Sequence, residues 1–214
     1  MMTASIMLSD RWWFSLFELS GIFVFAASGA IAGVRRGLDP FGVLVISFIT
    51  ACGGGLMRDV LLGDFPPAVI SDWRYLPVTI IAGLSTFYGF KTIDKFDHPL
   101  LFLDAIGLGF FSMVGTLKAL DFNMMPHWAV MFGVITGVGG GILRDMVLMQ
   151  IPVVLRADFY ALPALIGSAI MVLMIMLLEY DAGFSAVIGA SICVILRMLA
   201  IRNQWGLSPR NLNE

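Results

Sequence analysis

Long blocks of apolar residues, separated by short polar links, make up most of the chain. Most blocks reach the ~17–25 residues that an α-helix needs to cross the hydrocarbon core of a bilayer. Trp12 and Trp13 begin the first block, and Arg35 and Arg36 end it, as interfacial anchors of a membrane helix do. The pattern predicts an all-α polytopic membrane protein with seven transmembrane helices, at residues 12–34, 40–62, 75–90, 100–120, 126–150, 159–178 and 184–201.

Composition agrees with a membrane protein along the whole chain. Apolar residues make up 59% of the sequence and charged residues 13%, against about 25% charged residues in a soluble domain. No link is long enough to hold a soluble domain, so residues 1–214 are interpreted as one membrane domain. The net charge of −2 and the lack of a basic cluster argue against a nucleic-acid partner. Cys52 and Cys193 both lie in apolar runs, which favours buried thiols over a disulfide.

One motif occurs twice. GGGLMRD at residues 53–59 returns as GGGILRD at residues 139–145, with an offset of 86 residues. The same offset aligns further residues over three helices: Glu18 with Asp104, Gly29 with Gly115, Pro40 with Pro126, Thr50 with Thr136, and Pro66 with Pro152. Because each half holds an odd number of helices, the second half must cross the membrane in the opposite direction. We therefore predict two inverted three-helix repeats, at residues 12–92 and 98–178, and a seventh helix at residues 184–202.

The glycine triplets are expected to kink or partly unwind their helices. Each glycine costs a helix ~1 kcal/mol relative to alanine, and three in a row cover every side of the helix. Inverted-repeat proteins place ion and substrate sites at such breaks. The expected ion path is lined by Gly53, Gly54, Gly55, Gly139, Gly140 and Gly141 and by the hydroxyls of Ser28, Thr50 and Thr136. The small residues spaced by four near each triplet also fit simple helix packing, and that alternative stays open.

Charged residues inside the predicted spans form the second candidate feature: Glu18, Arg58, Asp59, Asp104, Arg144 and Asp145. A charge at the centre of a membrane helix costs ~2.5–3.5 kcal/mol, so each of these residues needs a partner or a wet cavity. Neighbouring residues on a helix point about 100° apart, and an arginine is therefore not expected to pair well with the aspartate that follows it. Arg58 and Arg144 are instead expected to meet carboxylates of other helices, with Glu18, Asp104 and the aspartate of the opposite repeat as candidates.

These charges suit either of two roles. They could line a path that favours cations, or they could be paired pins that hold the two halves together. Lys118 lies near the end of its helix. It is either a movable gate on the same path or a side chain that snorkels to the interface.

Enzyme activity has no support in the sequence. The only histidines, His98 and His127, fall in or beside predicted loops. There is no HExxH motif, no cysteine cluster, and no GK[ST] after the glycines. We expect no cofactor and no bound metal.

Lysines and arginines in the links predict the orientation. One alternating set of links holds Arg35, Arg36, Lys91, Lys95, Arg156, Arg202 and Arg210, and the other holds Arg11 and Arg74. This asymmetry places the N-terminus outside and the C-terminus in the cytoplasm. Residues 1–11 are interpreted as a short leader without the features of a signal peptide, so the first span is expected to remain.

The doubled GGGxxRD motif, the seven helices and the inverted halves resemble the prokaryotic branch of the trimeric intracellular cation (TRIC) channel family, whose sequences are also labelled glycine-transporter-domain membrane proteins. The resemblance covers nearly the whole chain. It implies a homotrimer whose protomers each hold a pore between the helices at residues 40–62 and 126–150. The permeant ion would be K⁺ or Na⁺, chiefly potassium. Lys118 matches a basic residue that is implicated in gating in animal relatives.

The sequence thus favours a monovalent cation channel of the cell inner membrane, selective for potassium over anions. The alternative is a secondary transporter of a small solute such as glycine, because inverted repeats with broken helices serve carriers equally well. A third hypothesis is a membrane assembly protein that transports nothing and uses its charges as structural pins.

Overall fold

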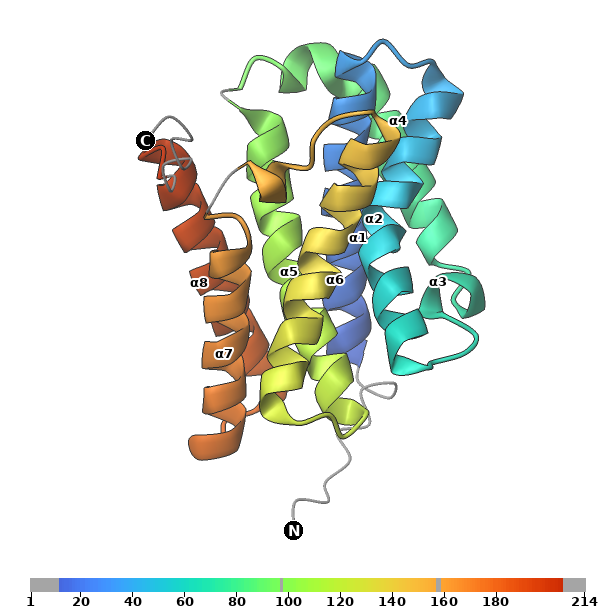
Figure 1. Cartoon of the computed structure of the whole chain (residues 1–214). Helices are drawn as coiled ribbons and strands as arrows, with labels where there is room; N and C mark the ends of the chain where they lie inside the picture. The colour runs from blue at the N-terminus through green and yellow to red at the C-terminus, as the bar shows by residue number, and fades with distance from the viewer. Residues whose placement is uncertain (1–11, 97, 157–158, 206–214) are drawn as a thin grey trace, which may run out of the picture.

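The computed structural model describes residues 12–96, 98–156 and 159–205 as a bundle of helices (Figure 1). The expected leader at residues 1–11 and the loop residue Arg210 lie outside the described residues. The elements, in order, are α1 (Trp12–Arg35), α2 (Pro40–Leu62), α3 (Ala68–Ser71), α4 (Tyr75–Ile93), α5 (Pro99–Asp121), α6 (Pro126–Val147), the 3₁₀ helix η2 (Val153–Leu155), α7 (Ala161–Leu177) and α8 (Ala182–Arg202).

Six of the described helices are long and apolar enough to cross a membrane, namely α1, α2, α4, α5, α6 and α8. The remaining predicted span corresponds to α7, which is apolar but has only 17 residues. No strand occurs among the described residues. The prediction of an all-helical membrane protein is therefore confirmed. Two short elements, α3 and η2, lie in links for which the sequence predicted no helix.

Capping residues set several helix ends. The Asp39 side chain accepts a hydrogen bond from the Gly42 amide at 2.7 Å, directly before Pro40 begins α2. Gly63 ends the same helix with a φ of 73°, a left-handed conformation that glycine adopts without strain. At the start of α8, the Asp181 side chain accepts hydrogen bonds from the amides of Gly183 and Phe184.

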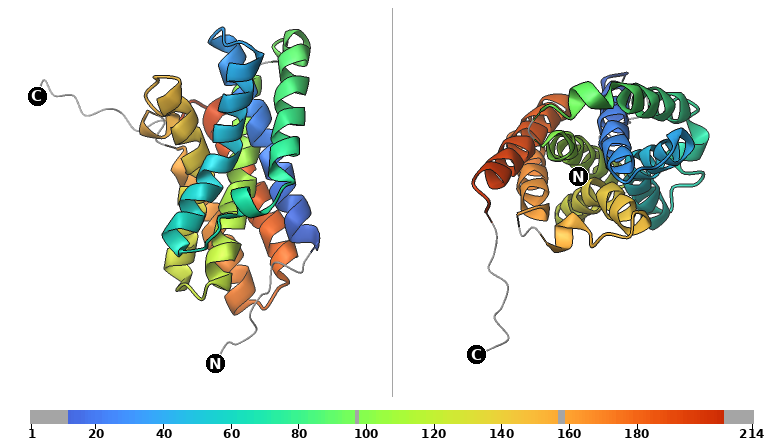
Figure 2. Two further views of the ribbon diagram at one scale, coloured as in Figure 1. Left: turned by 90° about the vertical axis from the view of Figure 1, so that its right-hand side faces the viewer. Right: turned by 90° about the horizontal axis from the view of Figure 1, so that it is seen from above.

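The two halves run in opposite directions. In Figure 1, α1 and α4 ascend and α2 descends, whereas α5 and α7 descend and α6 ascends. The halves meet where α1 packs on α5 and α2 packs on α6. The additional helix α8 packs on α5 and α7, at the periphery and away from α4 (Figure 2).

The glycine triplets lie where α2 and α6 touch. A Cβ atom added to Gly54 would overlap the backbone oxygen of Thr136, and one added to Gly140 would overlap that of Thr50. Both helices stay α-helical through their triplets, so the predicted unwinding is wrong. Gly54 and Gly140 are needed because the two backbones are in direct contact there, and this packing offsets the low helix propensity of glycine.

Other equivalent residues of the two repeats also pack close to the same contact. The rings of Phe25 and Phe111 stack with centroids 5.2 Å apart and planes 19° apart. The helix pairs α1–α2 and α5–α6 approach closely as well. A Cβ on Gly29 would sit 2.9 Å from the backbone oxygen of Ile46, and one on Gly115 would sit 2.9 Å from that of Phe132. The centre of the bundle is therefore built from small residues and backbone contacts.

Substitutions within one triplet test this packing. Gly54→Ala should lower the stability of the protein by about 1–3 kcal/mol or more, because the new methyl group forces the two backbones apart. Gly55→Ala is the matched control. Its Cβ would have only the Arg58 side chain nearby, at 3.8 Å, and helix propensity alone predicts a gain of up to ~1 kcal/mol. Thermal unfolding of the purified variants in detergent measures both, and equal stability of the two would contradict the assigned contact.

Candidate functional site

Two clusters of buried charges lie at opposite ends of the bundle. Arg58 is four residues before the end of α2, and Arg144 is three residues before the end of α6. Because these helices run in opposite directions, the glycine contact separates the two arginines (Figure 1). We call the first group cluster 1, made of Glu18, Arg58, Asp59, Asp64 and Lys118. Cluster 2 consists of Ser28, Asp104, Arg144, Asp145 and Tyr160.

Cluster 1 centres on the carboxylate of Asp59. Its Oδ1 atom accepts hydrogen bonds from Arg58 Nε at 2.8 Å and from Lys118 Nζ at 2.7 Å. The second nitrogen of the arginine fork, Nη2, lies 3.6 Å from Glu18 Oε1 on α1. Arg58 and Asp59 are both 1% exposed. Two cations therefore share one buried aspartate.

Lys118 connects the two repeats. It comes from α5, and its ammonium group also lies 2.6 Å from Asp64 Oδ2, in the link that follows α2. Its side chain is 15% exposed, and that of Asp64 is 32% exposed. Lys118 is thus held between two carboxylates at the edge of the bundle instead of extending freely toward the interface.

Cluster 2 is more tightly bonded. Arg144 Nη1 donates to Asp104 Oδ1 at 2.8 Å and to Ser28 Oγ at 3.0 Å, while Nε donates to Asp145 Oδ1 at 2.9 Å. The other oxygen of Asp104 accepts from the Tyr160 hydroxyl at 2.7 Å. Both Arg144 and Asp104 are at most 2% exposed. These are charge-assisted hydrogen bonds, which are shorter and stronger than neutral ones.

Each motif aspartate also caps the short helix that follows it. Asp59 Oδ2 accepts from the amide of Ala68, the first residue of α3. Asp145 Oδ2 accepts from the amide of Val153, the first residue of η2. Both amides follow a proline, so the prolines after each motif were the available signal for these helices. The motif Arg-Asp pair thus fixes the link after its helix as well as the neighbouring helix.

The pairing of the arginines corrects one prediction and fits another. Each arginine does bond to the aspartate next to it, because its long side chain can fold back to reach that carboxylate. Each arginine also meets a carboxylate from another helix, as predicted, with Glu18 near Arg58 and Asp104 bonded to Arg144. Each of these two pairs joins residues of the same repeat: Glu18 and Arg58 in repeat 1, and Asp104 and Arg144 in repeat 2. Among the described residues, neither arginine pairs with the motif aspartate of the opposite repeat.

The two clusters differ in how completely they are bonded. Arg58 Nη1 is buried without a hydrogen-bond partner in the described part of the chain. The residue 86 positions after Ser28 is Val114, which has no side-chain acceptor, so cluster 1 lacks a counterpart of the hydroxyl that Arg144 uses in cluster 2. Beside Arg58 is a cavity of ≈ 10 Å³, which is about the space of one water molecule. Cluster 1 is therefore the looser of the two.

The predicted ion-path hydroxyls are buried in this conformation. Thr50 and Thr136 donate to backbone oxygens one turn earlier in their own helices, at 2.7 Å and 2.6 Å. Ser28 accepts from Arg144. All three residues are 0% exposed. The structure thus places these hydroxyls next to the glycine contact and cluster 2, where they are buried and hydrogen-bonded to the protein.

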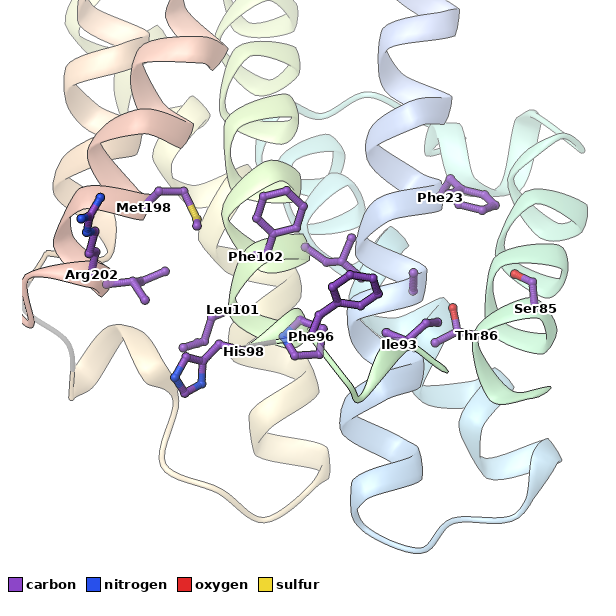
Figure 3. Close-up of a pocket in the computed structure, with 14 residues that line it drawn as sticks. Phe23, Ser85, Thr86, Ile93, Phe96, His98, Leu101, Phe102, Met198 and Arg202 are labelled. Atoms are coloured by element: carbon purple, nitrogen blue, oxygen red, sulfur yellow. The ribbon is translucent and has the colours of Figure 1, made fainter. Parts of the chain in front are cut away.

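A large cavity lies to one side of these clusters. It has a volume of ≈ 850 Å³ and is bordered by α1, α4, α5 and α8. In Figure 3, Met198 and Arg202 of α8 stand on one side of it, and Ser85 and Thr86 of α4 stand on the other. Most of its lining is apolar, so it offers few groups that could replace the hydration of an ion.

The remaining candidate groups are an ion pair outside the spans, the two cysteines and the metal-binding side chains. Outside the spans, Arg74 donates to Asp72 Oδ2 at 2.6 Å, and this bond lowers the pKa of the Asp72 carboxyl. The ion pair stabilises the conformation of the link between α3 and α4. Cys52 and Cys193 are free and buried, as the sequence predicted. No group of three or more metal-binding side chains occurs within the described ranges.

Known proteins with similar sequences are membrane proteins. A family model described as "Glycine transporter" matches residues 15–91 and 101–176. A "UPF0126 membrane protein" of Deinococcus radiodurans is 36% identical over 200 residues, which cover 92% of both chains. The "UPF0126 inner membrane protein YadS" of Escherichia coli is 34% identical over 198 residues, covering 92% of this chain and 96% of the relative.

Solved structures of membrane proteins superpose on nearly the whole chain. A structure described under "Structural basis for conductance through TRIC cation channels" superposes with a TM-score of 0.83 at 36% identity, over 94% of this chain and 98% of that one. The TRIC trimeric intracellular cation channel orthologue from Rhodobacter sphaeroides superposes with a TM-score of 0.84 at 28% identity, over 91% and 100% of the two chains.

Removing one carboxylate from each cluster tests whether cluster 2 is bonded more tightly than cluster 1. Asp104→Asn should destabilise the protein by about 3–5 kcal/mol, because it leaves the buried Arg144 charge without its main cross-helix partner. Glu18→Gln should cost clearly less, since Glu18 lies 3.6 Å from Arg58 and is 12% exposed. Thermal unfolding in detergent compares the two variants, and a larger loss for Glu18→Gln would refute the ranking.

Proposed function

The chain belongs to the glycine transporter family of membrane proteins and has the fold of the TRIC cation channels, and on this premise we propose that it conducts monovalent cations, chiefly potassium. The strongest support within the chain is the position of Lys118, which forms two ion pairs. Lys118 is inserted between Asp59 and Asp64 at one end of the contact between the two repeats. A cation that competes with permeant cations for carboxylates is suited to act as a gate.

The proposed ion path runs inside each protomer, between α2 and α6. At the glycine contact no side chains separate the helices, so a small displacement would expose backbone oxygens such as those of Thr50 and Thr136. The nearby hydroxyls of Ser28, Thr50 and Thr136 could add to the oxygens that replace ion hydration. The carboxylates of cluster 1 favour cations over anions at the entrance.

Gating would consist of moving Lys118 away from the path. In the described conformation its ammonium group neutralises Asp59 and links α5 to the segment after α2. Release of the lysine leaves Asp59 and Asp64 free to attract a permeant cation. Arg58 and Arg144 contribute fixed positive charges at the two ends, and their aspartate partners offset them.

We propose seven spans, with α7 included, in the inner membrane. The end of the bundle that holds Arg35, Arg36 and Lys91 would face the cytoplasm, following the positive-inside rule. Cluster 1 would then lie toward the outside, where α1 begins. The trimeric state of the Rhodobacter sphaeroides orthologue supports a homotrimer here as well. We propose no enzyme activity, since the solved relatives reported above are channels.

A second candidate function is secondary transport of a small solute such as glycine. The description of the matching family model favours it, and inverted repeats are common in carriers. A carrier would bind its solute at the repeat interface and would give saturable uptake.

Recording from purified protein in planar bilayers under a potassium chloride gradient separates the two candidates. Discrete current steps that reverse near the potassium potential support the channel. Saturable glycine uptake into proteoliposomes without current steps would favour the carrier, and the absence of both activities would contradict both proposals.

Lys118→Ala should raise the open probability of the channel. If its two ion pairs stabilise the closed state by roughly 1.4 kcal/mol, the closed–open equilibrium shifts about tenfold. Lys91→Ala is the matched control, because Lys91 is exposed in the last turn of α4. Single-channel recording measures both variants. Unchanged gating in Lys118→Ala would remove this residue from the mechanism.

A further inference from the structure

Arg197 is a buried charge that the ion path described above does not use. It lies on α8, beyond residues 15–91 and 101–176 that match the family model. Arg197 is only 4% exposed. Its Nη1 donates to the backbone oxygen of Phe159 at 3.1 Å, and its Nε has no hydrogen-bond partner among the described residues. Burying a guanidinium in a membrane helix is costly, so its position calls for a reason.

The guanidinium lies on the ring of Tyr160. Its Cζ atom is 4.6 Å from the ring centroid, within the range of a cation–π contact. Tyr160 is 2% exposed, and its hydroxyl donates to Asp104. Asp104 in turn accepts from Arg144. A continuous series of contacts therefore leads from α8 to the motif arginine of repeat 2.

Repeat 1 has a different arrangement. The residue 86 positions before Tyr160 is Arg74, and the neighbouring Tyr75 lies beside Glu18 in the lining of the small cavity near Arg58. The additional cation of cluster 1 is Lys118, which is partly exposed and approaches from α5. α8 packs on α5 and α7. The α8 side chain Arg197 reaches Tyr160 of cluster 2, whereas the additional cation of cluster 1 comes from α5.

We propose that Arg197 is a positioning residue that holds Tyr160 in place and thereby keeps cluster 2 closed, so that opening is confined to the end of the protein that contains Lys118. This inference rests on the proposed function for its meaning. The stacked guanidinium restricts the orientation of the tyrosine ring, and the tyrosine hydroxyl keeps Asp104 bonded to Arg144. Without this support, water can compete for Arg144 and Ser28.

Cysteine labelling measures the proposed lock without any current. In a background with Cys52→Ala and Cys193→Ala, Ser28→Cys places a thiol next to Arg144. A membrane-impermeant methanethiosulfonate reagent reacts with this thiol only when water reaches it. We expect slow labelling in this reference protein. Adding Arg197→Gln or Tyr160→Phe should speed labelling about tenfold, the change in open population expected from losing one buried hydrogen bond to a charged group.

A matched label reports on cluster 1, because position 114 lies one helical turn before Lys118 on α5. Val114→Cys, in the same background, occupies the position equivalent to residue 28. Arg197→Gln and Tyr160→Phe should leave its labelling rate unchanged. Tyr160→Phe keeps the ring under Arg197 and removes only the hydroxyl, so it tests the inference even if Arg197→Gln does not fold.

Each result decides the question. Faster labelling at residue 28 alone supports the lock. Unchanged labelling at residue 28 in a folded variant overturns it, and equal acceleration at both labels overturns it too, because it shows general loosening. These results do not depend on ion conduction, so a failure to record currents would count against the channel and leave the labelling test intact.

Discussion

Direct contact between the backbones of α2 and α6 is the constraint on which the rest of the structure depends. Gly54 and Gly140 are each placed against the backbone of the opposite helix, at positions related by the internal repeat. No other residue type fits there. Because the helices touch without side chains between them, the two halves can be joined tightly and yet separate by a small movement. Membrane helices gain stability mainly from such close packing.

The charges at the two ends complement this contact. Each motif arginine connects its helix to a neighbouring helix, and each motif aspartate fixes the short helix after it. The same ionic groups thus serve as structural pins and as the polar environment of the proposed path. The two roles that the sequence left open are therefore compatible. The incomplete bonding of Arg58, compared with Arg144, makes the two ends unequal.

Much of the fold could be predicted from the sequence, because apolar blocks reveal helices and the repeated motif reveals the internal symmetry. Unwinding at the triplets was wrongly predicted because helix propensity ignores the backbone of a second helix, and only tertiary structure shows that Gly54 faces Thr136. The bond between Arg58 and Asp59 was missed because residue spacing ignores the reach of an arginine. The contact between Arg197 and Tyr160 joins residues from distant elements, and no local pattern indicates it.

The valine at position 114, where the other repeat has Ser28, has a consequence for the direction of transport. The scaffold is nearly two-fold symmetric, and a fully symmetric protein would present the same charges to both sides of the membrane. Ser28 gives cluster 2 a hydroxyl that cluster 1 lacks, and this difference helps to make the two ends of the proposed path chemically distinct. In the proposed channel, an applied voltage of either sign would meet a different entrance, which is the asymmetry required for current rectification.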